Sequence, residues 1–171
     1  MDASNDSRAR ELIERLRLAP HPERGFFAET YRAPAAVDAS ATHGGARAAS
    51  TAIYFLLTRD EPFPFLHRLK SDEIFHLYEG GPLDLLCLYP DGRSDVRVLG
   101  LDLAAGERPQ LVIPAGAWFG AEIHPKASHC LFGCTVAPGF DFADFELAEG
   151  PELASRFPAH ADRIARLTRR R

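Results

Sequence analysis

Three residues near the middle of the chain have side chains that could do chemistry together. His67, Glu73 and His76 fall within ten residues, in or beside segments that read as strands. Imidazole nitrogens and a carboxylate, drawn from neighbouring strands of a β-barrel, are ligands that suit Fe, Mn, Ni or Zn. The same groups could instead move protons, because burial shifts the pKa of a Glu or His toward neutral pH. Residue types alone leave both chemistries open.

The spacing limits which of these residues can share one pocket. On a regular strand Glu73 and His76, three positions apart, face opposite sides. Only a bulge or a strand start near Glu73 would bring both into one pocket. The structural alternatives are a surface or turn histidine at His67, a solvated carboxylate at Glu73 and a hydrogen-bonded histidine on the far face at His76.

Helical patterns flank the segment that carries these residues. Apolar residues spaced by three and four predict a helix over about residues 7–18. Residues 33–49 are rich in Ala, Gly, Ser and Thr, which predicts a loop. A C-terminal helical segment is expected over about residues 151–169, with a break at Pro158.

Between the helices, short strand patterns alternate with Gly- and Pro-containing turns. In the extended segment 25–32, Phe27, Glu29 and Tyr31 should share one face. About nine short strands predict an antiparallel sandwich or small barrel, and the absence of long helices between them excludes a doubly wound fold. The expected strands after the first are 51–58, 74–78, 83–89, 96–99, 111–113, 117–123, 128–136 and 140–147. We therefore expect a single all-β domain with flanking helices, its barrel spanning about residues 25–147.

Composition excludes several classes of protein. The net charge of −4, with no basic stripe beside the aromatic residues, argues against a nucleic-acid-binding domain. No apolar run approaches the roughly 20 residues of a membrane helix, and the acidic start lacks the pattern of a signal peptide. The chain has three cysteines, Cys87, Cys130 and Cys134. An odd number without an export signal indicates reduced thiols, which are usually buried. We expect a cytoplasmic protein.

Two motifs in the chain resemble those of the cupin superfamily. His67, Glu73 and Gly80 match the spacing of the first motif, and Pro114 and Gly116 match the second. Over residues 12–147 the longer pattern resembles the cupin type-five domain, a group of small proteins of uncharacterised function. The stretches that carry this resemblance are Pro20–Glu23, Glu29–Arg32, Ser71–His76, Pro114–Trp118 and Val136–Phe140.

The resemblance implies an antiparallel double-stranded β-helix, the cupin jelly-roll barrel, with a pocket inside it. Two of the four positions that usually hold a metal in cupins carry Leu69 and Phe119 instead of histidine. The chemistry of metal-dependent dioxygenases is therefore not implied. A weak divalent metal held by His67, Glu73 and His76 remains the alternative.

Some cupins that work without a metal are sugar-nucleotide epimerases, such as dTDP-4-dehydrorhamnose 3,5-epimerase. These enzymes abstract a proton next to a carbonyl group with a histidine and a tyrosine. By analogy, His67 or His76 could act here with Tyr31 or Tyr78. The analogy rests on the fold, which does not determine function.

Three hypotheses follow. The first is a binder of a small, carbohydrate-like molecule, or an isomerase or epimerase acting on one without a tight metal, with His67, Glu73, His76 and Tyr31 as catalytic residues. The second is a metal-dependent enzyme, and the third is a non-catalytic binding or dimerisation module. The resemblance also implies a homodimer, which would cover an exposed strand edge. The residues expected to contact the ligand are Glu29, Leu69, Phe75, Trp118 and Phe119.

Overall fold

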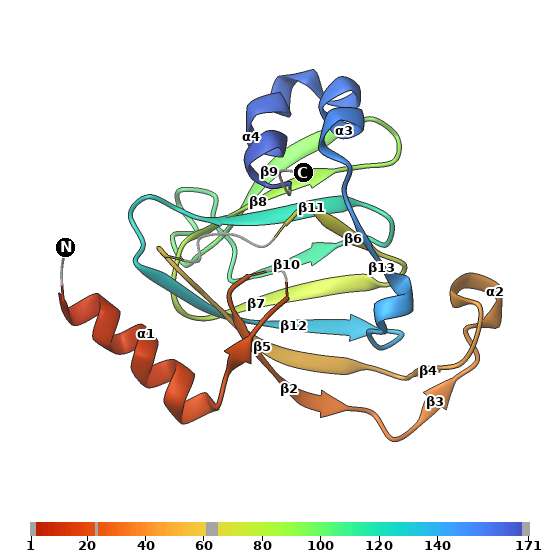
Figure 1. The fold of residues 1–171 in the computed structure, drawn as a ribbon, viewed down its shortest axis with the longest axis horizontal. Coiled ribbons are helices and arrows are strands. Elements are labelled where there is room, and N and C mark those ends of the chain that lie inside the picture. The colour runs from red at the N-terminus through yellow and green to blue at the C-terminus, as the bar shows by residue number, and fades with distance from the viewer. Residues whose placement is uncertain (1–2, 23, 61–64, 169–171) are drawn as a thin grey trace.

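A computed structural model describes residues 3–22, 24–60 and 65–168, which form two antiparallel β-sheets packed face to face with helices on the outside (Figure 1). The strands of one sheet are β1 Ala19–Pro20, β2 Phe26–Arg32, β5 Thr51–Thr58, β7 Asp72–Gly80, β10 Gln110–Ile113 and β12 His129–Ala137. Those of the other sheet are β6 His67–Leu69, β8 Leu83–Leu88, β9 Ser94–Leu99, β11 Trp118–Ile123 and β13 Phe145–Leu147. The strand orders are β1-β2-β5-β12-β7-β10 and β13-β6-β11-β8-β9.

Alternate residues of these strands point inward and form the core between the sheets. Phe75 of β7 and Phe132 of β12 belong to the same buried cluster as Leu85 of β8 and Phe119 of β11, from the opposite sheet. The packing of the two inner faces removes their apolar side chains from water, which is the main force that holds the sheets together. This arrangement confirms the all-β jelly-roll class with flanking helices.

Helices cover the outer faces of both sheets. Helix α1, Ala3–Leu16, packs Leu12 against Leu56 of β5 and Leu131 of β12. It begins and ends earlier than the predicted 7–18, and the chain leaves the helical conformation at Arg17, whose φ is +53°. In the part of the chain that the structure describes, no helix has the length and apolar character needed to cross a membrane.

The C-terminal segment covers the five-stranded sheet. Ile164 and Leu167 pack on Leu86 and Leu66, and the helical segment is interrupted at Pro158, as predicted. Its elements are α3 Gly150–Arg156, the short 3₁₀ helix η2 Pro158–His160 and α4 Ala161–Arg166. The basic tail 169–171, included in the predicted segment up to residue 169, lies outside the described residues.

Residues 33–49 are more ordered than the predicted loop. They contain β3 Ala36–Val37, α2 Ser40–His43 and β4 Arg47–Ala48, and β3 pairs with β4. Figure 1 shows this arm projecting from one side of the molecule. Arg47 donates two hydrogen bonds to Asp144, at 2.7 and 2.9 Å, and both side chains are largely buried. This contact was not predictable locally, because its partners are almost a hundred residues apart.

The arm thereby holds a second segment in place. Asp144 ends the 3₁₀ helix η1, Phe142–Asp144, which lies between β12 and β13. The backbone N–H of Gly139, just before this segment, donates to the carbonyl of Ala48 on β4. The chain from Gly139 to Phe145 is thus fixed at both ends by contacts to the arm and the sheets.

A register shift in β2 changes which of its residues face the core. Glu29 pairs with Ile53 of β5, but Tyr31 pairs with Ala52, so one residue of β2 is left over between them. A bulge of this kind reverses the alternation of side chains beyond it. Tyr31 therefore lies on the outer face, not with Phe27 and Glu29 as predicted from simple alternation.

Candidate functional site

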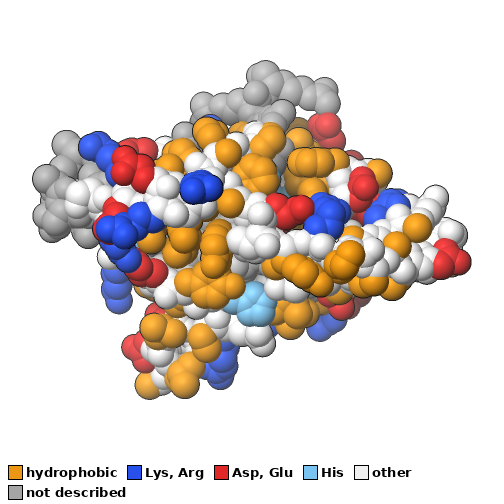
Figure 2. All heavy atoms as spheres, turned by 90° about the horizontal axis from the view of Figure 1, so that it is seen from below, with side chains coloured by type: hydrophobic (Ala, Val, Ile, Leu, Met, Phe, Trp, Pro, Cys, Tyr) orange, Lys and Arg blue, Asp and Glu red, His pale blue; other side chains and the backbone are white. Residues whose placement is uncertain are grey.

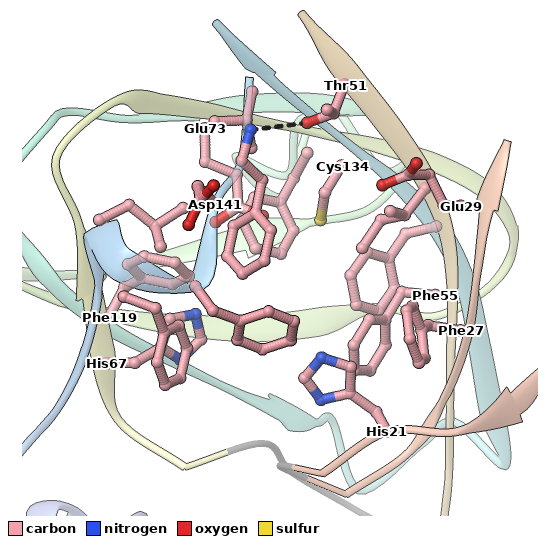
Figure 3. A pocket seen from close by; sticks show the side chains of 18 of the residues that line it. His21, Phe27, Glu29, Thr51, Phe55, His67, Glu73, Phe119, Cys134 and Asp141 are labelled. Atoms are coloured by element: carbon pink, nitrogen blue, oxygen red, sulfur yellow. Dashed lines mark hydrogen bonds between the residues drawn. The ribbon is translucent and has the colours of Figure 1, made fainter. Parts of the chain in front are cut away.

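A cavity of about 350 Å³ lies between the two sheets (Figure 3). Aromatic side chains make up much of its wall, and most of the phenylalanine residues of the chain line it. Phe132 stacks on Phe55 and on Phe75, with ring centroids 5.3 and 5.4 Å apart. Walls of this kind favour an apolar, flat molecule. The phenylalanines in the lining are Phe27, Phe55, Phe75, Phe119, Phe132, Phe140, Phe142 and Phe145.

Glu73 is a carboxyl group in these apolar surroundings. It is only 7% exposed, and its Oε2 has no hydrogen-bond partner among the described residues. The thiol of Cys134, on the neighbouring strand β12, forms a hydrogen bond with the carboxyl group. Burial raises the pKa of Glu73 to about 7, and the hydrogen bond with Cys134 opposes this only in part. Near neutral pH the group therefore exists in both its charged and uncharged forms.

His67 also lines the cavity, from β6 of the opposite sheet. Its Nδ1 lies 2.7 Å from the carbonyl oxygen of Phe65 and must donate to it, because a carbonyl only accepts. The ring lies between Phe119, at a centroid distance of 4.2 Å, and Phe145, at 5.0 Å. Burial lowers the pKa of His67 to about 4. The imidazole is therefore neutral at pH 7, with Nε2 as an acceptor.

A second histidine, His21, lies in the same cavity and was not assigned to the site from the sequence. It follows β1 and packs against Phe27 and Phe55, with centroids 4.8 and 5.2 Å away. Burial lowers its pKa to about 4, so this ring is neutral as well. Figure 3 shows His21 and His67 toward the same end of the cavity. The signal for His21 in the sequence is its place in one of the stretches that carry the cupin resemblance.

Exposed polar residues mark the mouth of the cavity. Arg32 donates to both carboxylate oxygens of Glu29, at 3.0 and 2.7 Å, and to the carbonyl oxygen of Phe140, at 3.2 Å. Asp141 lies across the cavity from Glu29 (Figure 3). Sequence analysis placed Glu29 here but missed Arg32 and Asp141. Arg32 faces the cavity because the bulge in β2 reverses the alternation after Glu29.

The structure brings together six of the residues named from the sequence and leaves out three. His76 is not in the lining, because β7 pairs without a register shift from Asp72 to Leu77 and His76 faces away from Glu73. Its ring nitrogens are hydrogen-bonded to Thr135 and Gln110, at 3.1 and 3.0 Å, on the outer face. The residues in the lining are Glu29, His67, Leu69, Glu73, Phe75 and Phe119.

Tyr31 and Trp118 are the other two residues outside the lining. Tyr31 is 52% exposed on the outer face, as is Tyr78 at 53%, so neither phenol is in the cavity with His67. Trp118 begins β11 and faces away from the cavity, where Arg68 stacks on its ring at 4.5 Å. An acid–base pair of histidine and tyrosine, as in the epimerases, therefore does not assemble in this cavity.

The residues present do not fit a cupin metal centre. Leu69 and Phe119 occupy two donor positions and line the cavity with carbon atoms only. His76, the candidate third ligand, faces the other side of the sheet. Among the described residues no group of three or more His, Cys, Asp and Glu side chains is arranged to hold a metal ion. The polar groups inside the cavity can instead hold, accept or donate protons.

Comparisons with known proteins agree with this fold. The chain is 32% identical over 157 residues to the uncharacterised protein YML079W of Saccharomyces cerevisiae, covering 85% of this chain and 78% of the yeast protein. A hypothetical protein from Leishmania major has a similar structure, with a TM-score of 0.84, 35% identity and coverage of 95% of this chain and 99% of that one.

A likeness in fold alone extends further. A cupin 2 conserved barrel domain protein from Rhodopseudomonas palustris has a TM-score of 0.54 at 16% identity, covering 86% of this chain and 81% of its own. The family model Cupin_5, described as "Cupin superfamily (DUF985)", matches residues 10–148. With its two-sheet barrel and its interior cavity, the chain belongs to the Cupin_5 family of the cupin superfamily.

Proposed function

We propose that this protein binds one small, largely apolar molecule in its cavity and uses Glu73 to move a proton next to a carbonyl group of that molecule. The observation that carries the proposal is the carboxyl group of Glu73, which is buried in an aromatic cavity and whose Oε2 has no hydrogen-bond partner within the described part of the chain. A buried polar atom without a partner costs free energy in the empty protein. A ligand that supplies the missing hydrogen bond recovers that cost.

The charge of Glu73 suits proton transfer. With a pKa of about 7, the carboxylate can take a proton from carbon, and the resulting acid can return it to a neighbouring atom. The net reaction is an isomerisation that needs no other reactant, because the proton that is removed is also the one that is returned. The Nε2 of His67 can accept a hydrogen bond from a hydroxyl group of the same ligand.

The residues that line the cavity favour a ligand with an uncharged body over a sugar nucleotide. Among the described residues that line the cavity, Arg32 is the one lysine or arginine, and Glu29 already holds its guanidinium group. A diphosphate would need cationic partners that this lining does not offer. Of the carbohydrate-like ligands suggested by the sequence, the cavity thus favours those without phosphate.

Hydrogen–deuterium exchange tests the reaction. Phenylacetone, a small uncharged ketone with an acidic CH₂ beside its carbonyl, is incubated with the protein in D₂O while its CH₂ signal is followed by NMR. We expect exchange by the wild type that is at least roughly tenfold faster than by Glu73→Gln, which keeps the shape and removes the acid. Glu146→Gln is the matched control, because Glu146 is exposed on β13 outside the cavity.

The outcomes separate binding from catalysis. Equal exchange by the wild type and Glu73→Gln would overturn the proton-transfer role. If NMR line broadening shows that phenylacetone binds the wild type without exchange, the protein is a binding module. If neither phenylacetone nor a panel of uncharged aromatic ketones binds, the proposal fails as a whole.

A further inference from the structure

Three phenylalanine rings gather at the mouth of the cavity. The ring centroids of Phe140 and Phe142 are 5.0 Å apart. The centroid of Phe145 lies 6.4 Å from that of Phe140 and 6.5 Å from that of Phe142. All three pairs meet edge to face, with interplanar angles of 78°, 72° and 65°. Phe142 is 64% exposed, an unusual position for a large apolar ring. The rings thus present aromatic faces in several directions around the mouth.

The charges at the mouth are mainly negative. Glu29 and Asp141 contribute two carboxylates and Arg32 one guanidinium group. Nε and Nη2 of Arg32 both donate hydrogen bonds to the carboxylate of Glu29. Asp141 accepts a hydrogen bond from the backbone N–H of Ala143 through Oδ1, and its neighbours along the chain, Phe140 and Phe142, are two of the three rings. The mouth therefore carries a net charge of one negative unit.

The interior does not offset this charge. His21 and His67 are both neutral at pH 7, because burial disfavours their charged forms. Glu73 adds either no charge or one more negative charge. An anionic group entering the cavity would meet like charge at the mouth and find no free cation among the described lining residues. A cation would meet carboxylates and the negative faces of aromatic rings.

We propose that the mouth binds an organic ammonium group, so that the ligand is an amphiphilic amine whose apolar body fills the cavity. The inference rests on the proposed function and narrows its class of ligand. Aromatic rings next to a carboxylate suit a bound alkylated ammonium ion, because such a cation is weakly hydrated, loses little when it leaves water and gains the attraction of the ring faces. In such a ligand, the ammonium group stays at the mouth while the carbonyl group reaches Glu73.

Three probes with the same phenylalkyl body test this inference by calorimetry. One carries a trimethylammonium group, the second its uncharged tert-butyl isostere, and the third a carboxylate. The isostere measures binding of the apolar body alone, which is the proposed function. We expect the ammonium probe to bind about tenfold more tightly than the isostere, and the carboxylate probe to bind more weakly than either.

Two variants assign the effect to the mouth. Asp141→Asn removes the charge but keeps an oxygen that can accept from Ala143. Phe142→Ala removes one ring. Asp141→Asn should reduce the advantage of the ammonium probe over the isostere about threefold or more. Phe142→Ala removes part of the cavity wall and should weaken binding of both probes, with the larger loss for the ammonium probe, so that its advantage again falls about threefold. The controls are Glu146→Gln, an exposed carboxylate outside the cavity, and Leu101→Ala, an apolar side chain that is 71% exposed elsewhere.

The result that overturns the inference differs from the one that overturns the proposed function. If the isostere binds and the ammonium probe binds no better, the cavity is an apolar site and the ammonium inference is wrong. If the advantage persists undiminished in Asp141→Asn and in Phe142→Ala, the cation binds elsewhere, and the inference is again wrong. If the isostere fails to bind, the proposed function falls, and the inference falls with it.

Discussion

Glu29 and Arg32 are three positions apart on β2, yet both face the cavity and form a two-bond ion pair there. On a regular strand they would lie on opposite faces. The register shift between Glu29 and Tyr31 brings them to the same side. The single extra residue between Glu29 and Tyr31 thus places an ion pair at the mouth and also turns Tyr31 to the outer face.

The ion pair at the mouth, Glu29 with Arg32, and the pair that anchors the 33–49 arm, Arg47 with Asp144, should differ in their effect on stability. Glu29 and Arg32 are both more than 40% exposed, whereas Arg47 and Asp144 are 11% and 5% exposed. Glu29→Ala should lower the free energy of unfolding by less than about 1 kcal/mol. Asp144→Ala should lower it by more, on the order of 2 kcal/mol, because the largely buried guanidinium group of Arg47 loses its carboxylate partner and keeps only backbone carbonyl acceptors. Urea unfolding measures both, and equal losses would contradict this ranking.

Glu73 should make the protein less stable as the pH rises. The pKa of its carboxyl group is about 7 in the folded chain against an ordinary value of 4.5, so the folded chain holds this proton more tightly than the unfolded chain does. The stabilisation is complete below pH 4.5 and is lost as the pH rises through 7. The loss should be on the order of 3 kcal/mol.

The matched variant for this measurement is Glu73→Gln, which cannot ionise. Its free energy of unfolding, from urea titrations between about pH 5 and 8, should lack the decline seen in the wild type. If the free energy of unfolding varied with pH in the same way for both proteins, the pKa of Glu73 would not be raised in the folded chain.

The histidines of the cavity should act in the opposite direction. The pKa of His67 is lowered from 6.5 to about 4, so protonation is harder in the folded chain. Its contribution is complete above pH 6.5 and is lost as the pH falls through 4. His67→Phe places a ring of similar shape between Phe119 and Phe145 and should reduce the acid sensitivity of unfolding. A variant as acid-sensitive as the wild type would assign the effect to other groups, with His21→Phe as the next test.

Restoring the missing donors should create a metal site. We expect the wild type to retain little transition metal after purification, because Leu69 and Phe119 offer no donor atoms beside His67 and Glu73. The double variant Leu69→His with Phe119→His should take up about one equivalent of Zn²⁺ or Ni²⁺, measured by elemental analysis after dialysis. Near-stoichiometric metal in the wild type would contradict the expectation for these residues.

We also propose that the protein forms a two-fold homodimer through its strands. In the described part of the chain, β1 pairs with Phe26 and Phe27 only, so the outer edge of β2 beyond them is open. Tyr31 and Tyr78 are large exposed side chains on the outer face of this sheet. Figure 2 shows apolar side chains gathered on the face between α1 and the β3–β4 arm. A second copy would cover this edge and these rings.

Light scattering measures the dimer directly. The wild type should give twice the monomer mass at micromolar concentration, and Tyr31→Asp should shift the protein toward monomer. Leu101→Asp is the control for a charge added at an exposed apolar position away from this sheet. A wild-type monomer mass would refute the proposed dimer.

Much of the site could be predicted from the sequence, and for a physical reason. The alternation of apolar residues and the turns between them depend on neighbours along the chain, so the strands and the antiparallel class followed from the pattern. The pair His67 and Glu73 followed from the spacing of the first cupin motif, and Leu69 and Phe119 identified the two absent donors. On a regular strand, simple alternation also gave the correct separation of Glu73 and His76.

Other parts of the site depended on contacts between distant segments. The bulge that turns Arg32 inward and Tyr31 outward exists because β2 pairs with β5, and nothing local in residues 26–32 marks it. His21, Asp141 and the rings of the mouth enter the cavity because the ends of the barrel bring separate segments together. The raised pKa of Glu73 has the same origin, since it is the packing of both sheets that removes the carboxyl group from water. The residue types came from the sequence, but their exposure and charge were decided by what the fold packs around them.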